Sequence, residues 1–189
     1  MLGGRFYTED ELTSAGFSRV GRNVKIHNRC SIYCPENISI GDNVRIDDFA
    51  VLIATGPVSL GNFTHIPNFC FIGANAGFEM QDFATLAPGV HIYTSSDDYS
   101  GEALTNAVVP KQFTGGTRSS VVLERHVIIG ASSVILPGVT IGEGSSVGAL
   151  SLVKTDLEPW GIYCGCPVRR LRGRSKGLLA LASAVISDE

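Results

Sequence analysis

The chain has 189 residues, of which 44% are hydrophobic and only 17% charged, and its formal net charge is -3. This length suits one domain with a sizeable core rather than two large ones. The low charge and the 22 glycines argue against long charged helices. Weak acidity disfavours nucleic acid as the main partner, because that partner calls for a concentrated basic face.

The chain shows no signal-peptide core near its first residue and no apolar stretch of the roughly 18 residues that a membrane span needs. We therefore expect a cytoplasmic protein with no membrane association. Its five cysteines, an odd number, fit reduced thiols better than a disulfide framework.

A short helix is predicted in the lead-in, residues 1–19. Thr8 and Glu11 have the spacing of a capping box, and Gly16 suits the C-terminal cap of the same helix.

An internal repeat follows. Aliphatic residues recur every twenty positions in three series, with steps of six, six and eight, and then resume after a gap with a strict step of six. The series are Val20, Ile40, Leu60, Met80; Ile26, Ile46, Ile66, Leu86; Ile32, Leu52, Ile72, Ile92; and, after the gap, Leu123, Ile129, Ile135, Ile141, Val147, Val153.

A step of six fits neither an amphipathic helix nor simple strand alternation. It predicts a coil with three short strands per turn and a tight corner after each, where Gly, Asn and Asp are tolerated. The residue four positions after each inward aliphatic is often small, as at Ala50 and Cys70. We predict an all-β fold of about six stacked coils over residues 20–158, because stacking buries a core that no single repeat can bury. The alternative, a sandwich of hairpins, would show alternating strands without this step.

The hexads break once, over residues 93–122, and a loop of this length inside a compact solenoid is usually functional. Residues 159–189 form a C-terminal cap, with a second helix over 178–186. The two terminal segments would cover the open backbone edges of the solenoid.

Two stretches carry a resemblance to a known family. Residues 129–144 (IGASSVILPGVTIGEG) and 161–168 (GIYCGCPV) resemble the hexapeptide-repeat acyltransferases, which fold as left-handed parallel β-helices. Residues 6–12 (FYTEDEL) and 96–101 (SDDYSG) are similar to the nucleotide-sugar N-acyltransferases of the anthrose-pathway type.

This resemblance implies a left-handed coil, an acyl-CoA thioester as cosubstrate, and an acceptor such as a dTDP-linked 4-amino-4,6-dideoxyhexose. It also implies a homotrimer with sites between adjacent prisms, and a place in polysaccharide or surface-glycan biosynthesis.

The loop supplies the catalytic candidates. Many relatives carry a loop histidine near the place of Asp97, whereas this sequence has no histidine between His91 and His126. A sugar hydroxyl is a very weak acid that benefits from an imidazole base, but a carboxylate can accept the proton that a sugar amine loses. We therefore predict Asp97 as the base and Glu102 as the group that orients the amine. The alternative is that Asp97 and Asp98 simply cap a turn.

The oxyanion donor is expected to be a main-chain N–H of the segment around Ala87, because the related group has a serine near that place and alanine offers no side-chain donor. Substrate contacts are expected from His65, which stacks in register with Arg45 on an outer edge, or is simply a solvated edge residue. The loop residues Asp98, Tyr99 and Lys111 complete this set. His27 and His126 are expected at the surface.

For coenzyme A, the resemblance implies the groove beside the small residues of the late coils, including Gly130, Ala131 and Ala149. The basic residues Lys154, Arg169 and Arg170 would meet its phosphates. Trp160 would either pack on the adenine or close the prism. No metal site is expected, because no histidine pair has ligand spacing and the Cys164–Cys166 pair lacks a partner pair.

The sequence therefore favours an acyl-CoA-dependent N-acyltransferase acting on a nucleotide-linked amino sugar. Two alternatives stay open: an O-acetyltransferase of a sugar or antibiotic hydroxyl, and a trimeric β-helix that binds without catalysing.

Overall fold

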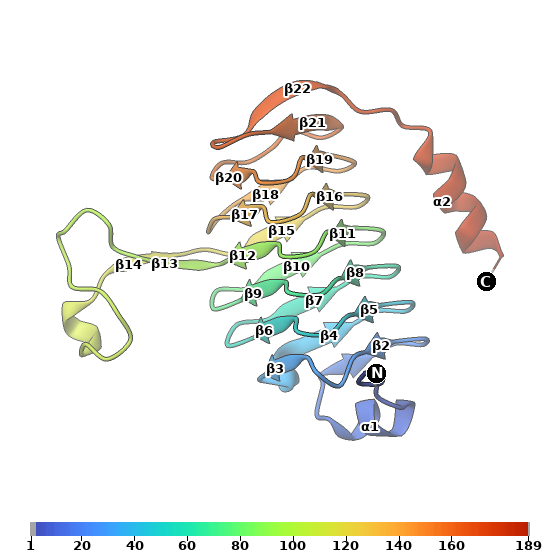
Figure 1. Cartoon of the computed structure of the whole chain (residues 1–189), viewed down its shortest axis with the longest axis horizontal. Helices are drawn as coiled ribbons and strands as arrows, with labels where there is room; N and C mark the ends of the chain where they lie inside the picture. Colours follow the sequence, from blue (N-terminus) through green and yellow to red (C-terminus); the bar gives the residue numbers. More distant parts are fainter. Residues whose placement is uncertain (1–2, 189) are drawn as a thin grey trace.

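The computed structural model describes residues 3–188 as a prism of stacked coils with a helix at each end and one projecting loop (Figure 1). Three parallel sheets form the sides of the prism, and consecutive strands of the chain fall in successive sheets. None of the helices among these residues is long and apolar enough to cross a membrane.

The first sheet contains β1 (Arg19–Val20), β4 (Ile38–Ile40), β7 (Val58–Leu60), β10 (Phe78–Met80), β15 (Val121–Leu123) and β18 (Thr140–Ile141). The second contains β2 (Lys25–Ile26), β5 (Arg45–Ile46), β8 (His65–Ile66), β11 (Thr85–Leu86), β16 (Ile128–Ile129), β19 (Ser146–Val147), β21 (Gly161–Cys164) and β22 (Arg169–Gly173). The third contains β3 (Ser31–Tyr33), β6 (Val51–Ile53), β9 (Phe71–Gly73), β12 (His91–Tyr93), β17 (Val134–Ile135) and β20 (Leu152–Val153). The helices are α1 (Glu9–Ser14) and α2 (Leu178–Ser187), with 3₁₀ turns η1 (Pro35–Asn37) and η2 (Lys111–Phe113); β13 (Ser95–Asp97) and β14 (Gly116–Arg118) form a separate hairpin.

The described strands give six complete coils, and β21 continues the second sheet above them by pairing parallel with β19. The predicted coil architecture is confirmed, and the hairpin sandwich is excluded because the strands of all three sheets that build the coils pair in parallel, apart from the closing β22. The left-handedness of the coil stays a prediction.

The core consists of the repeating aliphatic residues. Within each sheet their side chains stack directly above one another, as in the register of Ile46 with Ile66 and of Ile72 with Ile92. Nearly every position of the three series is buried, with Val20 and Ile32 at the N-terminal end partly exposed. The small residues Ala50 and Cys70 are buried as expected, because they fit where a corner turns inward.

Side chains of the next coil hold the corners of the first sheet. The amide N–H of Asp42 donates to Asn62 Oδ1 at 2.8 Å, and that of Asn62 donates to Asp82 Oδ1 at 2.7 Å. A side chain at Gly41 would place its Cβ 2.6 Å from the Asn62 Oδ1 atom. Residue 41 must therefore be a glycine, because the Asn62 oxygen that accepts the Asp42 N–H occupies the place of a side chain.

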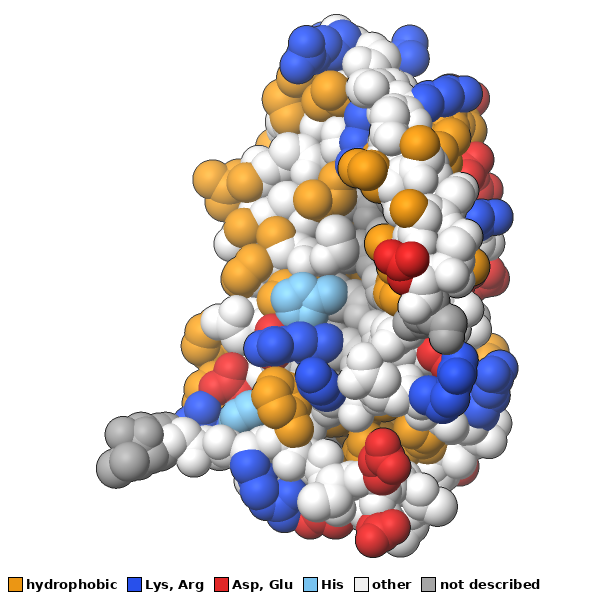
Figure 2. Space-filling model, turned by 90° about the vertical axis from the view of Figure 1, so that its right-hand side faces the viewer, with side chains coloured by type: hydrophobic (Ala, Val, Ile, Leu, Met, Phe, Trp, Pro, Cys, Tyr) orange, Lys and Arg blue, Asp and Glu red, His pale blue; other side chains and the backbone are white. Residues whose placement is uncertain are grey.

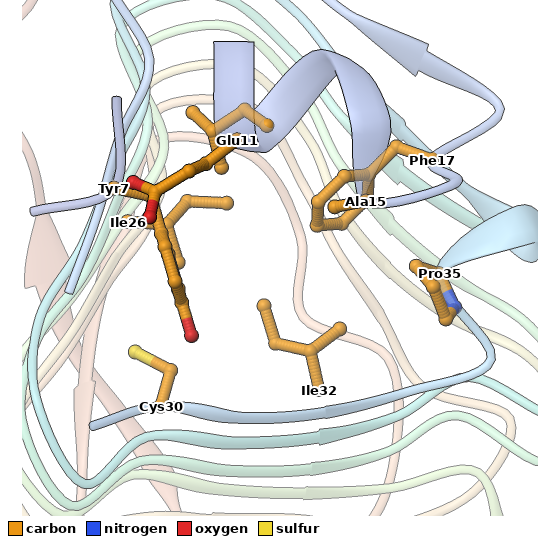
Figure 3. A pocket seen from close by; sticks show the side chains of 9 residues that line it. Tyr7, Glu11, Ala15, Phe17, Ile26, Cys30, Ile32 and Pro35 are labelled. Atoms are coloured by element: carbon orange, nitrogen blue, oxygen red, sulfur yellow. The ribbon is translucent and has the colours of Figure 1, made fainter. Parts of the chain in front are cut away.

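Both predicted helices are present. Thr8 and Glu11 form the capping box of α1, and Gly16, with a φ of +83°, follows the helix end at Ala15. A cavity of about 250 Å³ lies between α1 and the first coil, and Figure 3 shows Tyr7, Phe17, Cys30 and Ile32 around it. At the other end β22 pairs antiparallel with β21, and α2 leaves the stack beyond it (Figure 1).

Candidate functional site

The only long excursion among the described residues is the loop between β12 and β15, and it projects from the stack on a two-stranded stalk (Figure 1). The stalk is the hairpin β13–β14, in which Asp97 pairs with Gly116. Gly116 has a φ of +142°, and a Cβ there would lie 2.1 Å from the carbonyl oxygen of Ser96. The strands can therefore close only around a glycine.

The two aspartates of the loop have different surroundings. Asp98 Oδ1 accepts from the N–H and hydroxyl of Ser100 at 2.9 and 2.7 Å, and its Oδ2 accepts from the N–H of Ala103 at 2.9 Å. These hydrogen bonds, those from Ser100 first, lower the pKa of the Asp98 carboxyl to about 2. The turn-capping interpretation is thus confirmed for Asp98.

Asp97 differs from its neighbour. Its side chain is exposed at the end of β13, and among the residues described here its carboxylate has no hydrogen-bond partner. The side chain of Glu102 is also exposed and unbonded within residues 3–188. Tyr99, 92% exposed, and Lys111, in η2, lie on the same loop. The loop therefore offers two free carboxylates, Asp97 and Glu102.

His65 and Arg45 meet on the outer face of the second sheet, in the predicted register. Between them lies Asp47, which the sequence analysis missed. His65 Nε2 is 2.7 Å from Asp47 Oδ2, and Arg45 Nε donates to Asp47 Oδ1 at 2.7 Å. Partial burial alone would raise the pKa of the Asp47 carboxyl, but the bonds from His65 and Arg45 outweigh it and hold that pKa below its usual value.

A signal for Asp47 was present in the sequence, because opposite charges two positions apart along a strand share a face. Its carboxylate holds the His65 ring through Nε2, and the Nδ1 atom makes no hydrogen bond among residues 3–188.

The residues expected around coenzyme A lie near the last coils. Lys154, Arg169 and Arg170 are exposed, and Figure 2 shows Lys and Arg side chains gathered at the upper end of the molecule. Ala149 is exposed and Ala131 half-buried.

The packing of the coils explains why residue 130 is a glycine. A Cβ at this position would lie 2.4 Å from the amide nitrogen of Ala149, so the stacking of the coils already excludes a side chain. The same holds at Gly144, where a Cβ would fall 2.5 Å from the Trp160 ring. The Trp160 ring thus packs over the corner at Gly144, with the Lys176 ammonium 5.0 Å from its ring centre.

The expected oxyanion donor is wrong. The N–H of Ala87 donates to the carbonyl of Ile129 at 2.8 Å, Pro88 has no N–H, and the N–H of Gly89 donates to Asn68 at 3.2 Å. Because all donors of this segment are used inside the stack, Ala87 offers no free hydrogen bond to a reacting carbonyl.

The surface position predicted for His126 is also wrong. Its side chain is 5% exposed and stacks on Phe83 with ring centres 5.2 Å apart. Burial lowers its pKa. His27 is half-buried, with its ring edge-on to Phe6.

Within residues 3–188 no three His, Cys, Asp or Glu side chains are placed to hold a metal ion. The cavity at the N-terminal end contains a thiol, Cys30, and burial raises the pKa of this thiol to about 11. A thiol in that state is a poor nucleophile.

Comparisons with known proteins identify the family of this chain. The family model "Bacterial transferase hexapeptide (six repeats)" matches residues 120–155. The chain is 41% identical over 179 residues to the dTDP-4-amino-4,6-dideoxy-D-glucose acyltransferase of Escherichia coli, covering 94% of this chain and 93% of that one. The chain belongs to the hexapeptide-repeat acyltransferases, in the group of nucleotide-sugar N-acyltransferases.

Solved structures of this group have the same fold. AntD, an N-acyltransferase from Bacillus cereus in complex with dTDP and 3-hydroxybutyryl-CoA, superimposes with a TM-score of 0.94 at 43% identity, over 98% of each chain. A more distant member of the acyltransferases, the chloramphenicol acetyltransferase of Klebsiella aerogenes, is 31% identical over 58% of this chain and 50% of its own.

The predicted residues of this acyltransferase form three groups within one chain. The loop group leaves the third sheet on one side of the stack, the His65 group lies on the second sheet, and the basic group lies at the C-terminal end (Figure 1).

Proposed function

We propose that this chain transfers an acyl group from an acyl-CoA thioester to the amino group of a dTDP-linked 4-amino-4,6-dideoxyhexose. The observation that carries the proposal is the likeness to acyltransferases of this substrate class along nearly the whole length of both chains. AntD crystals contain dTDP-4-amino-4,6-dideoxyglucose together with coenzyme A, which supports both substrates.

Asp97 is proposed as the base. The amine attacks the thioester carbonyl and forms the C–N bond of the amide, the carbon–sulfur bond breaks, and coenzyme A leaves as a thiolate. The attacking nitrogen loses one proton, which the Asp97 carboxylate accepts. The AntD structures include variants of a serine and of an aspartate ten positions apart, and Ala87 and Asp97 are also ten positions apart. The free carboxylate of Asp97 and its equal spacing both support this role, with Glu102 orienting the amine.

The remaining assignments are proposals on the same basis. His65 and Arg45 would contact the sugar or its diphosphate, Tyr99 and Lys111 would contact the substrate from the loop, and Lys154, Arg169 and Arg170 would hold the phosphates of coenzyme A beside Ala131 and Ala149. Asp98 would act by holding the loop.

A homotrimer is proposed as the working form. The loop exposes apolar side chains that a single copy leaves in water, with Leu104 59%, Val108 91% and Phe113 56% exposed. Exposed apolar groups at the tip of a projecting loop are typical of a surface that a second chain covers.

The test uses paired acceptors. The chain is incubated with acetyl-CoA or 3-hydroxybutyryl-CoA and either dTDP-4-amino-4,6-dideoxyglucose or dTDP-glucose, which has a hydroxyl where the first has the amine. Products are identified by mass, because the exposed Cys166 would consume a thiol reagent. Acylation of the amino sugar alone supports the proposal. Acylation of dTDP-glucose indicates an O-acetyltransferase, and no product with either acceptor indicates a binding module.

Sharing of the site between copies is tested by complementation. Asp97→Asn and His65→Ala chains are co-expressed and the mixed oligomers assayed. If the two residues reach a site from different copies, mixed oligomers regain part of the activity, whereas a site within one copy gives no recovery.

A further inference from the structure

Corner residues with a left-handed backbone form two columns along the stack. The first corner column is Asn23, Asn43, Phe63, Phe83, His126, Gly144 and Trp160; the second is Phe49, Phe69, Gly89, Ser132 and Leu150. All have φ between +52° and +71°. Phenylalanine rarely adopts this backbone conformation, because its Cβ crowds the neighbouring peptide.

In the first corner column the aromatic rings of the chain cover one another along the stack. The rings of Phe63 and Phe83 stack 4.7 Å apart at 4°, and His126 continues the stack. The next position, Gly144, has no side chain, and the Trp160 ring covers it.

In the second corner column no aromatic ring of the described residues covers the upper face of the stack. Phe49 and Phe69 stack 5.3 Å apart at 6°, and the Arg29 guanidinium lies 4.7 Å from the Phe49 ring centre, closing the lower end. The position above Phe69 is Gly89, which has no side chain, and the nearest atom to a Cβ there would be Ser132 Oγ at 3.2 Å. Phe69 is 58% exposed, and its only ring contact among residues 3–188 is with Phe49.

The space above Phe69 can be compared with the thickness of a planar ring. Adjacent coils lie about 4.8 Å apart, so Phe69 and Ser132, two coils apart, are separated by roughly 9.5 Å, with only the side-chain-free Gly89 between them. A flat ring needs about 3.5 Å on each face, which fits between these levels. Ser132, which is exposed, brings a hydroxyl to the far side.

We propose that the uncovered face of Phe69 stacks on the thymine ring of the nucleotide-sugar substrate. This inference rests on the proposed function and names a residue that selects the nucleotide. Nucleobases stack on aromatic side chains through their π-faces. The strand that follows Gly89 is β12, which leads into the loop that carries Asp97, so the base would lie along the third sheet, on the side from which the loop projects.

Binding of dTDP and of coenzyme A is measured by calorimetry for the wild-type chain, Phe69→Ala, Phe69→Trp and Phe63→Ala. Phe63 is the matched control, since it has the same backbone conformation and a stacked phenylalanine partner in the other column. Phe69→Ala is expected to weaken dTDP binding roughly 5- to 150-fold and to leave coenzyme A binding unchanged. Phe69→Trp should retain dTDP binding, and Phe63→Ala should bind dTDP as the wild type does.

Four results would overturn the inference, three in binding and assembly and one in turnover. Phe69→Ala could bind dTDP as tightly as the wild type, it could lose coenzyme A instead, or it could sediment as a different oligomer from the wild type, which would assign the Phe69 face to a second copy. Failure of the proposed function is distinguishable: it would show as a wild-type chain that neither binds dTDP nor acylates the amino sugar. Wild-type turnover with an unchanged KM in Phe69→Ala overturns the stacking alone.

Discussion

Replacing Gly116 by alanine tests whether the projecting loop is the working part of the molecule. The added Cβ would lie 2.1 Å from the Ser96 carbonyl oxygen and 3.1 Å from the Asp97 Cα, both main-chain atoms that cannot rotate away. Gly101 offers a matched control in the same loop. It also has positive φ, at +87°, but a Cβ there meets nothing within 4 Å.

The magnitudes separate the two variants. A non-glycine residue in a sparsely populated backbone region costs about 1–3 kcal/mol, and both variants carry this cost. The stalk is held by three residue pairs, and each hydrogen bond contributes about 0.5–1.5 kcal/mol net. Gly116 lies in the stalk itself, so the strain and the overlap there both oppose its pairing, whereas the strain at Gly101 falls outside the paired residues. The coils lie outside the stalk and keep their buried aliphatic core.

We expect Gly116→Ala to lose at least about 100-fold in turnover, because catalytic groups that are misplaced by an ångström lose that much. Its thermal unfolding midpoint should stay close to that of the wild type, and the loop should become cleavable by protease. Gly101→Ala should retain most of the turnover. Wild-type activity in Gly116→Ala, or an equal loss in both variants, would refute the assignment of the reaction to this loop.

Further expectations concern single side chains. Asp97→Asn should abolish turnover while coenzyme A binding, measured by calorimetry, is preserved; wild-type turnover would remove Asp97 as the base. Because the folded pKa of Asp98 is about 2, below its ordinary 3.8, its bonds should persist above about pH 4 and be lost as the pH falls toward 2, which exchange of the Ala103 amide proton would report. Ile92→Ala, in the centre of the stack, should cost about 2–5 kcal/mol in chemical denaturation. Iodoacetamide at pH 8 should label the exposed Cys166 but not Cys70, whose pKa burial raises to about 11; rapid labelling of both in the folded state would contradict the packing of the core.

The sequence was a good guide to the stack because each coil repeats the same physical requirement. An aliphatic residue must occupy the same inward position in every turn, so positions such as Ile46 and Ile66 are visible as a period without any knowledge of distant contacts. The capping box of α1 was predictable for a related reason, since Thr8 and Glu11 interact within four residues of each other.

The corners were less predictable, because their contacts join residues of different coils that lie far apart in the sequence. The side chain that satisfies the Asp42 amide belongs to Asn62, and the ring that covers Gly144 belongs to Trp160. The error at Ala87 has the same origin. A main-chain N–H was expected here because alanine has no side-chain donor, but Ile129 of the following coil accepts the Ala87 N–H.

The two adjacent aspartates of the loop could not be assigned separate roles from the sequence pattern. Either Asp97 or Asp98 could act as a base or cap a turn. Three hydrogen bonds from Ser100 and Ala103 assign the structural task to Asp98. A carboxylate bonded in this way is a weak base, because its charged form is already stabilised, and its pKa is correspondingly low. A base in this loop therefore has to be a carboxylate that makes no hydrogen bonds within the fold. Of the adjacent pair, only Asp97 meets that condition among the described residues.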